Sequence, residues 1–134
     1  MISDTNLVIE VRGNSMTGIL EHGDRVAVIA GPICKYDLVI YMDIKGGVNV
    51  KQVIGIPNDR LHVQGNSITI EDRTISLTES EAECWKTWIP EDGRIPGGCL
   101  FLIGTRADSI DSKQTGFIFY PQILGRAKKL SILE

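Results

Sequence analysis

Short runs of apolar residues, separated by turn residues, dominate this sequence. The runs are rich in Val, Ile and Leu, which favours strands over helices. Gly, Pro, Asn and Asp gather between them, as is typical of turns. The pattern predicts strands over residues 7–11, 25–30, 38–42, 48–56, 60–63, 67–70, 100–103 and 125–133.

Two neighbouring runs predict a β-hairpin. Residues 60–63 and 67–70 flank the short loop 64–66, which contains a glycine. The apolar run 100–103 follows a Gly-rich turn, and we expect it to be a central strand. The chain is therefore expected to be all-β, with twisted antiparallel sheets.

Helical signals are few. Residues 17–21 and 121–124 predict single turns, and residues 80–85 predict a helical turn with Ser80 as N-cap and Glu83 in the capping-box position. The stretch 71–93 is polar and irregular, so we interpret it as a loop-rich insertion. At 134 residues the chain is expected to form one domain, 1–134.

Composition excludes some classes of function. The net charge of −3 comes without a basic stripe, so nucleic acid is not an expected partner. No apolar run is long enough to span a membrane, and residues 1–6 do not read as a signal peptide. No cysteine or histidine spacing indicates a metal site, and no cofactor is expected.

The three cysteines leave two interpretations open. Cys84 and Cys99 could form a disulfide in an oxidising compartment, which would leave Cys34 free. Alternatively, all three are small buried thiols.

Ser15 and Lys51 are the strongest candidates for catalytic residues in this sequence. A serine hydroxyl becomes a nucleophile when a base takes its proton. A lysine can be that base if burial disfavours its charged form, and Lys51 lies in the apolar run 48–54. A Ser–Lys dyad is a known variant of serine hydrolase chemistry.

Four stretches, in order, resemble the bacterial signal peptidase I family. They are the nucleophile box GNSMTGIL (13–20), the strand GDRVAV (23–28), the base box VKQVIGIPND (50–59) and the loop SIDSKQTGF (109–117). GRA at 125–127 matches the closing motif of the family. The resemblance implies a partly open, barrel-like catalytic fold.

The resemblance also implies roles for individual residues. Ser15 would be the nucleophile and Lys51 the general base. Ser109 would hydrogen-bond and orient the Lys51 amine, and Asp111 and Lys113 would form a supporting ion pair.

Further positions are implied around the nucleophile. Met16 and Asn14 would line the substrate cleft, and the oxyanion would rest on the Ser15 backbone N–H beside Gly13. The substrate would lie extended along an open strand edge near Gly13, with small side chains at the first and third positions before the cut.

This sequence departs from the family pattern at four places. Gly18 replaces a proline, Lys113 replaces an arginine that would make a bidentate fork, and Gly13 replaces a serine that aids the oxyanion. Residues 104–106 replace a Gly-Asp-Asn sequence, and the run to Ser109 is short. The short run is similar to the TraF-type peptidases of conjugative transfer.

The function implied is cleavage of signal or leader peptides from preproteins, with a pilin precursor as a narrower substrate. The expected place is the extracytoplasmic face of the bacterial inner membrane, against the membrane surface. Family members carry a transmembrane helix before the nucleophile, and the fourteen residues before Ser15 leave open whether such an anchor was removed or never existed.

Two other functions stay open. One is a self-cleaving protease of the LexA or UmuD kind, which shares the serine, the Gly-Asp strand and a later lysine. The other is an inactive β-module, in which Ser15 is an ordinary turn serine and Lys51 an edge-strand lysine that opposes aggregation.

Four further side chains have simpler interpretations. His22 and His62 lack partners at a recognisable spacing and are expected at the surface. Trp85 and Trp88 either sit in a membrane interface or pack the insertion onto the sheet.

Overall fold

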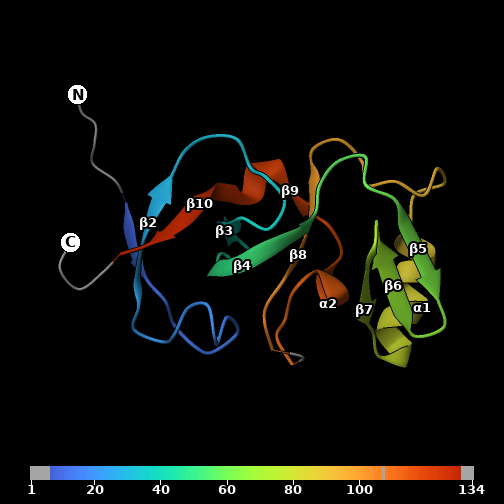
Figure 1. Ribbon diagram of the computed structural model, residues 1–134, viewed down its shortest axis with the longest axis horizontal. Coiled ribbons are helices and arrows are strands. Elements are labelled where there is room, and N and C mark those ends of the chain that lie inside the picture. The colour runs from blue at the N-terminus through green and yellow to red at the C-terminus, as the bar shows by residue number, and fades with distance from the viewer. Residues whose placement is uncertain (1–6, 107, 131–134) are drawn as a thin grey trace.

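Two antiparallel sheets make up the fold in the computed structural model, which describes residues 7–106 and 108–130 (Figure 1). Seven strands form the larger sheet. Three strands form the smaller sheet, and a helix follows them in the chain. The expectation of an all-β fold with short helices is confirmed.

The larger sheet runs in the order β1-β2-β10-β3-β4-β8-β9. Its strands are β1 (Val8–Glu10), β2 (Arg25–Ile29), β10 (Ile123–Lys129), β3 (Leu38–Met42), β4 (Val48–Gly55), β8 (Cys99–Ile103) and β9 (Ile118–Phe119). The expected strand over 125–133 thus begins earlier, and its last residues, 131–133, lie outside the described part of the chain. The run 100–103 becomes β8, which is buried but is the last strand but one of the sheet, beside the edge strand β9, so it is not the central strand that we expected.

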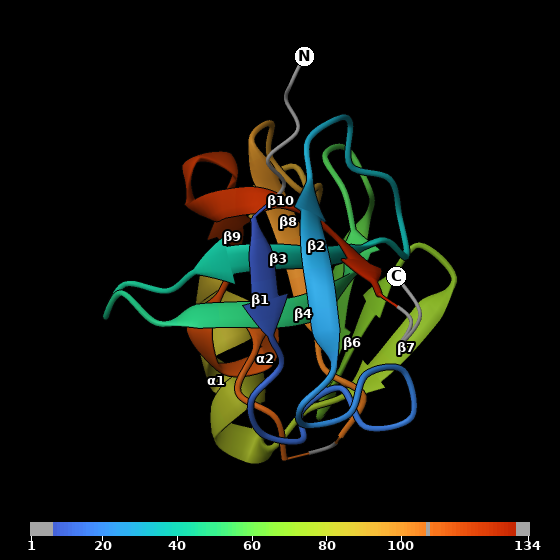
Figure 2. The same ribbon diagram turned by 90° about the vertical axis from the view of Figure 1, so that its left-hand side faces the viewer.

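The larger sheet curls sharply at β10. Figure 2 shows β1 and β2 running nearly perpendicular to β3 and β4, with β10 between them. The register of β10 against β3 shifts between Ile123 and Gly125. A Cβ on Gly125 would lie 2.7 Å from the Val28 side chain, and its φ of 157° is one that side chains disfavour. This bulge turns the sheet into the partly open barrel that we expected.

The smaller sheet contains β5 (Leu61–Gln64), β6 (Ser67–Ile70) and β7 (Arg73–Ser76), and α1 (Glu79–Trp88) follows it. The predicted hairpin is confirmed, with Gln64 paired to Ser67. The helix begins two residues before the expected position, because Thr78 is the N-cap and Glu81 completes the capping box.

The prediction that 71–93 is loop-rich was wrong. The stretch holds β7 and all of α1. β7 is mostly exposed and polar, and α1 buries only Ala82 and Trp85, so neither has a strong hydrophobic period. Both elements depend on tertiary packing, which in α1 adds to the capping box of Thr78 and Glu81.

Trp85 joins the smaller sheet and α1 to the larger sheet. Its side chain is fully buried against Phe101 and Phe117, and its indole N–H donates to the carbonyls of Ser112 and Lys113, at 3.1 Å each. Trp88 packs edge-on against it and is 37% exposed. Trp85 therefore packs the insertion onto the sheet, which decides between our two interpretations for this residue.

The remaining local predictions fare differently. The chain makes one turn after Met16, where the Leu20 N–H donates to the Met16 carbonyl at 2.8 Å. A 3₁₀ turn spans Tyr120–Gln122, and the chain then enters β10. All three cysteines are free, Cys99 is buried, and Cys34 and Cys84 are exposed. The Cys84–Cys99 disulfide is therefore absent, and burial applies to one thiol only.

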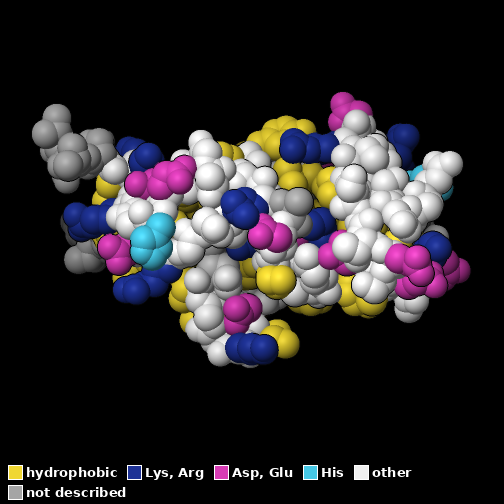
Figure 3. Space-filling view, turned by 90° about the horizontal axis from the view of Figure 1, so that it is seen from below, with side chains coloured by type: hydrophobic (Ala, Val, Ile, Leu, Met, Phe, Trp, Pro, Cys, Tyr) yellow, Lys and Arg dark blue, Asp and Glu magenta, His cyan; other side chains and the backbone are white. Residues whose placement is uncertain are grey.

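The surface is mixed in character. On the face seen in Figure 3, Lys, Arg, Asp and Glu side chains are interspersed with hydrophobic ones. In the described ranges, we find no helix with the length and hydrophobicity needed to cross a bilayer.

We predict that Trp85→Ala lowers the free energy of unfolding by about 3–5 kcal/mol, the usual cost of emptying a buried aromatic site. Urea unfolding measures the loss. Trp88→Ala is the matched control, and it should cost clearly less because that side chain is partly exposed. Equal losses for the two variants would contradict the central role of Trp85.

Candidate active site

Ser15 lies in the turn that follows β1, and two residues of a distant loop fix its backbone. The Ser15 carbonyl accepts a hydrogen bond from the Thr105 N–H at 2.8 Å, and the Thr105 hydroxyl donates to the Thr17 carbonyl at 2.6 Å. A Cβ on Gly104 would lie 2.5 Å from the Ser15 carbonyl oxygen and 2.7 Å from Ser109 Oγ. The chain can approach Ser15 this closely because residue 104 has no side chain.

Lys51 lies in the middle of β4, opposite Val39 of β3. Its side chain is almost completely buried, with 4% exposed. The Lys51 Nζ lies 2.9 Å from Ser15 Oγ, although the two residues are 36 positions apart in the sequence. The fold therefore brings together the two side chains that the sequence singled out.

Burial lowers the pKa of the Lys51 amine, since desolvation disfavours its charged form. The carboxylate of Asp111 opposes this effect by raising the pKa, and the ammonium of Lys113 reinforces it. The net direction is down from 10.5, so the neutral amine, which can accept a proton, is more accessible than in an exposed lysine.

Asp111 organises the loop beside this pair. It is fully buried, and it is the N-cap of α2 (Ser112–Thr115). Its carboxylate accepts hydrogen bonds from the Gly104 N–H at 2.9 Å, the Lys113 N–H at 3.0 Å and the Ser109 hydroxyl. The Lys113 amine contacts both carboxylate oxygens, at 2.7 and 2.9 Å. The Asp111–Lys113 ion pair expected from the sequence is therefore present as a contact.

One detail of this loop corrects our expectations. We expected Ser109 to hydrogen-bond the Lys51 amine, but the structure shows its hydroxyl donating to the Asp111 carboxylate. As the sequence predicts, the Lys113 amine has one nitrogen and forms no fork, and it contacts both carboxylate oxygens from a buried position.

A cleft of about 290 Å³ opens beside Ser15 and Lys51. Its walls are two strand segments with free edges. β1 is the edge strand of the larger sheet, and β4 pairs with β8 only from Gln52 onwards, which leaves the edge of residues 48–51 open. The side chains that line the cleft are Ile9, Glu10, Val11, Arg12, Ser15, Met16, Val48, Asn49, Val50 and Lys51.

The structure separates the two residues that we expected in the cleft. Met16 is among the lining residues, although it is 98% covered and also packs in the core. Asn14 is exposed and lies outside the lining, and its carbonyl accepts a bond from the Thr17 hydroxyl at 2.6 Å. Asn14 therefore shapes the turn, and its placement in the cleft was wrong.

The backbone amides near Ser15 have different partners. The Gly13 N–H donates to Nδ1 of His22 at 2.9 Å, so this amide is occupied. In the ranges that the structure describes, the Ser15 N–H has no acceptor. His22 thus has a partner, which the sequence did not indicate because a backbone amide leaves no signature in spacing.

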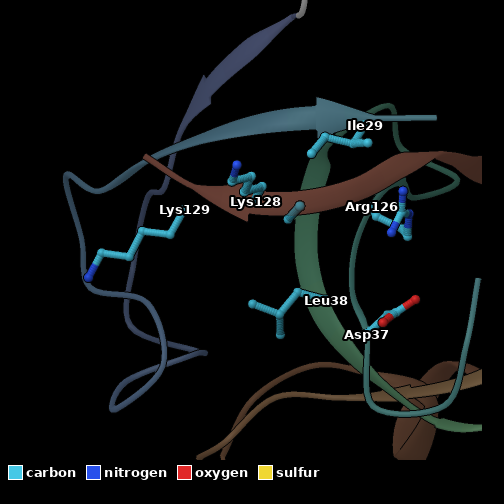
Figure 4. A pocket seen from close by; sticks show the side chains of 7 residues that line it. Ile29, Asp37, Leu38, Arg126, Lys128 and Lys129 are labelled. Carbon is cyan, nitrogen blue, oxygen red and sulfur yellow. The ribbon is translucent and has the colours of Figure 1, made fainter. Parts of the chain in front are cut away.

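A separate cavity of about 390 Å³ lies between β10 and the start of β3. Figure 4 shows Arg126 and Asp37 on one side of it and Lys128 and Lys129 toward the other. It contains none of the residues around Ser15. In the described ranges no group of three or more His, Cys, Asp or Glu could hold a metal ion.

Comparisons with known proteins show what the whole chain is similar to. Residues 5–131 match the family model described as signal peptidase, peptidase S26. The chain is 30% identical to signal peptidase I of Bacillus caldolyticus, covering 91% of this chain and 76% of that protein. It is 26% identical to signal peptidase I U of Bacillus subtilis (strain 168), covering 77% of this chain and 63% of that protein, slightly less than two thirds of its length.

A solved structure supports the fold. A signal peptidase I from Enterococcus faecalis V583 superposes with a TM-score of 0.50 at 19% identity, over 73% of this chain and 98% of that chain. At this level of identity the likeness concerns the fold.

We predict that the pKa of Lys51, followed by NMR at its side-chain carbon next to the amine, lies below 10.5. Lys113→Gln should raise it, because the variant removes a repelling charge. Asp111→Asn should lower it, because the variant removes an attracting charge and leaves Lys113 unopposed. Shifts in the same direction for both variants would contradict the electrostatic account.

Proposed function

This chain belongs to the signal peptidase family S26, and from that premise we propose that it is a serine endopeptidase that removes signal or leader peptides from preproteins. The observation that carries the proposal is the 2.9 Å contact between Ser15 Oγ and the buried amine of Lys51. A hydroxyl next to a desolvated amine is the minimum needed for nucleophilic attack on a peptide carbonyl.

The proposed reaction has two stages. The neutral Lys51 amine takes the Ser15 proton while Ser15 Oγ attacks the carbonyl carbon, and Lys51 then gives that proton to the leaving amine as the peptide bond breaks. A water molecule next gives a proton to Lys51 and attacks the acyl-enzyme carbonyl. As the ester bond to Ser15 Oγ breaks and the leader leaves, Lys51 returns that proton to Ser15 Oγ, which restores the hydroxyl and the neutral amine.

The developing oxyanion needs a hydrogen-bond donor. The Ser15 N–H is the candidate, since it lacks an acceptor within the described residues. Gly13 cannot supply its own N–H without giving up the bond to His22. In this proposal Ser109 acts through Asp111, because its hydroxyl is directed to that carboxylate.

The substrate would bind as an added strand between the free edges of β1 and β4. Main-chain hydrogen bonds to residues 48–51 of β4 would supply affinity that is independent of the substrate sequence. Apolar walls from Ile9, Val11 and Val50 would suit small side chains at the first and third positions before the cut.

We extend the proposal to place and partner. The enzyme would act at the extracytoplasmic face of the bacterial inner membrane, against the membrane surface, on preproteins with a cleavable leader. A narrower form is maturation of a conjugative pilin precursor, and its support is the short run from Gly104 to Ser109. Preferential cleavage of a pilin precursor over an ordinary preprotein would favour this narrower form.

We predict that Ser15→Ala and Lys51→Met each abolish cleavage of a leader-bearing preprotein, because one loses the nucleophile and the other the base. Gel analysis of the products measures the loss, and circular dichroism with thermal melting verifies the fold.

Lys86→Met is a suitable control, since Lys86 forms an exposed ion pair with Glu83 on α1, and it should cleave normally. Near-normal turnover by Lys51→Met would refute the base assignment. Cleavage of its own chain without cleavage of an added preprotein would instead favour a self-cleaving protease.

A further inference from the structure

A second cavity lies next to the cleft and has no role in the reaction described above. It is distinct from the cavity between β10 and β3. It has a volume of about 430 Å³, within the roughly 300–1,000 Å³ typical of ligand pockets. Its walls come from the β3–β4 hairpin, the loop between Ser109 and Asp111, and the segment after α2. Figure 2 shows that this hairpin projects beyond the rest of the sheet.

The walls of this cavity are largely apolar and exposed. Ile44 at the hairpin tip is 95% exposed, Ile110 is 65% exposed and Phe119 is 54% exposed. Single exposed apolar residues are common, but several around one hollow indicate a binding surface. The carboxylate of Asp43 is engaged by the hairpin itself, through the backbone amides of Lys45 and Gly47 at 2.9 Å each.

The cavity and the cleft share one lining residue, Asn49. In β4, Asn49 is two residues before Lys51, so both side chains project from the same face of the sheet. Tyr41 pairs with Asn49 and Val39 pairs with Lys51, which places the cavity on the Lys51 face. Val50 projects from the opposite face and packs with Met16.

The open edge of β4 connects the two faces. A peptide strand paired with residues 48–51 would direct alternate side chains to opposite faces. Side chains level with Val50 would enter the cleft, and side chains level with Asn49 or Lys51 would face the second cavity. Along β4 the cleft is lined by residues 48–51, and the cavity is lined by Asn49 and the hairpin beyond it. Both hollows therefore lie on the hairpin side of Lys51 and would serve residues on the same side of the cut.

We propose that the second cavity is a specificity pocket for one large apolar or aromatic side chain of the leader peptide, at an even-numbered position before the cut. This inference rests on the proposed peptidase function. Small residues at the first and third positions would occupy the cleft, and the second or fourth would reach Ile44, Ile110 and Phe119.

A set of cleavable peptides and a matching set of non-cleavable peptides test this proposal. All carry Ala at the first and third positions, and Phe replaces Ser at the second, fourth or fifth position. Phe at one of the even positions should raise kcat/KM about tenfold, as is usual for filling an apolar pocket, and Phe at the fifth should not. Non-cleavable versions, titrated onto Ser15→Ala by calorimetry, should show a matching gain in affinity.

The variant Ile44→Ser/Phe119→Ser should cleave the Ser peptides normally and lose the gain from Phe. Leu124→Ser is the matched control, because Leu124 is 41% exposed and lies outside the cavity lining. No gain at either even position, or a gain that survives in the double variant, overturns the proposal.

Two further outcomes are separable. If no peptide is cleaved but the affinity gain for Phe is present and lost in the double variant, the peptidase function fails and the pocket stands. If the double variant changes only cleavage in the presence of phosphatidylglycerol vesicles, the surface contacts a bilayer and the proposal is wrong.

Discussion

Keeping an amine uncharged inside the protein is the requirement around which the site is organised. Lys51 is desolvated by β3, β4 and the turn that carries Ser15, and this alone favours the neutral form. Asp111 has the opposite effect, because its buried carboxylate stabilises the charged form of Lys51 and raises the pKa of the amine. Lys113 removes much of that effect by binding both carboxylate oxygens. The ion pair thus helps the pKa of Lys51 stay below its ordinary value, because the Asp111 carboxylate is already paired with Lys113.

The smaller sheet and α1 support this charge arrangement from outside. The indole of Trp85 donates to the carbonyls of Ser112 and Lys113, so α1 is attached to the short helix that carries the ion pair. Asp111 in turn accepts the Gly104 N–H, and the next residue, Thr105, holds the Ser15 carbonyl. A continuous series of contacts therefore runs from a peripheral helix to the nucleophile. Loss of packing at Trp85 would reach Ser15 through the backbone rather than through its side chain.

Much of this could be predicted from sequence, and the limits have physical causes. Strand positions followed from apolar runs, and Ser15 and Lys51 followed from the order of the motifs. The strand β7 was missed and the helix α1 was predicted only as a turn over 80–85, because non-local packing around Trp85 stabilises both elements. Gly104, Thr105 and His22 each contact backbone atoms near Ser15, and no residue pattern in the sequence reports such contacts. The partner of Ser109 was mistaken because acceptor strength depends on geometry that only the fold determines.

The free edges of β1 and β4 also favour self-association of the protein. A strand edge that can bind a substrate peptide can also pair with the same edge of a second copy. Proteins commonly prevent such pairing with a charged lysine on the edge strand. Lys51 lies at that edge, but the proposed reaction requires its amine without the charge. Deterrence at this edge then falls to Glu10 and Arg12 on the opposite wall, whose charges are 3.5 Å apart and partly cancel. A strand edge that is open to substrate, with a lysine that reacts in its neutral form, is therefore expected to self-associate at high protein concentration.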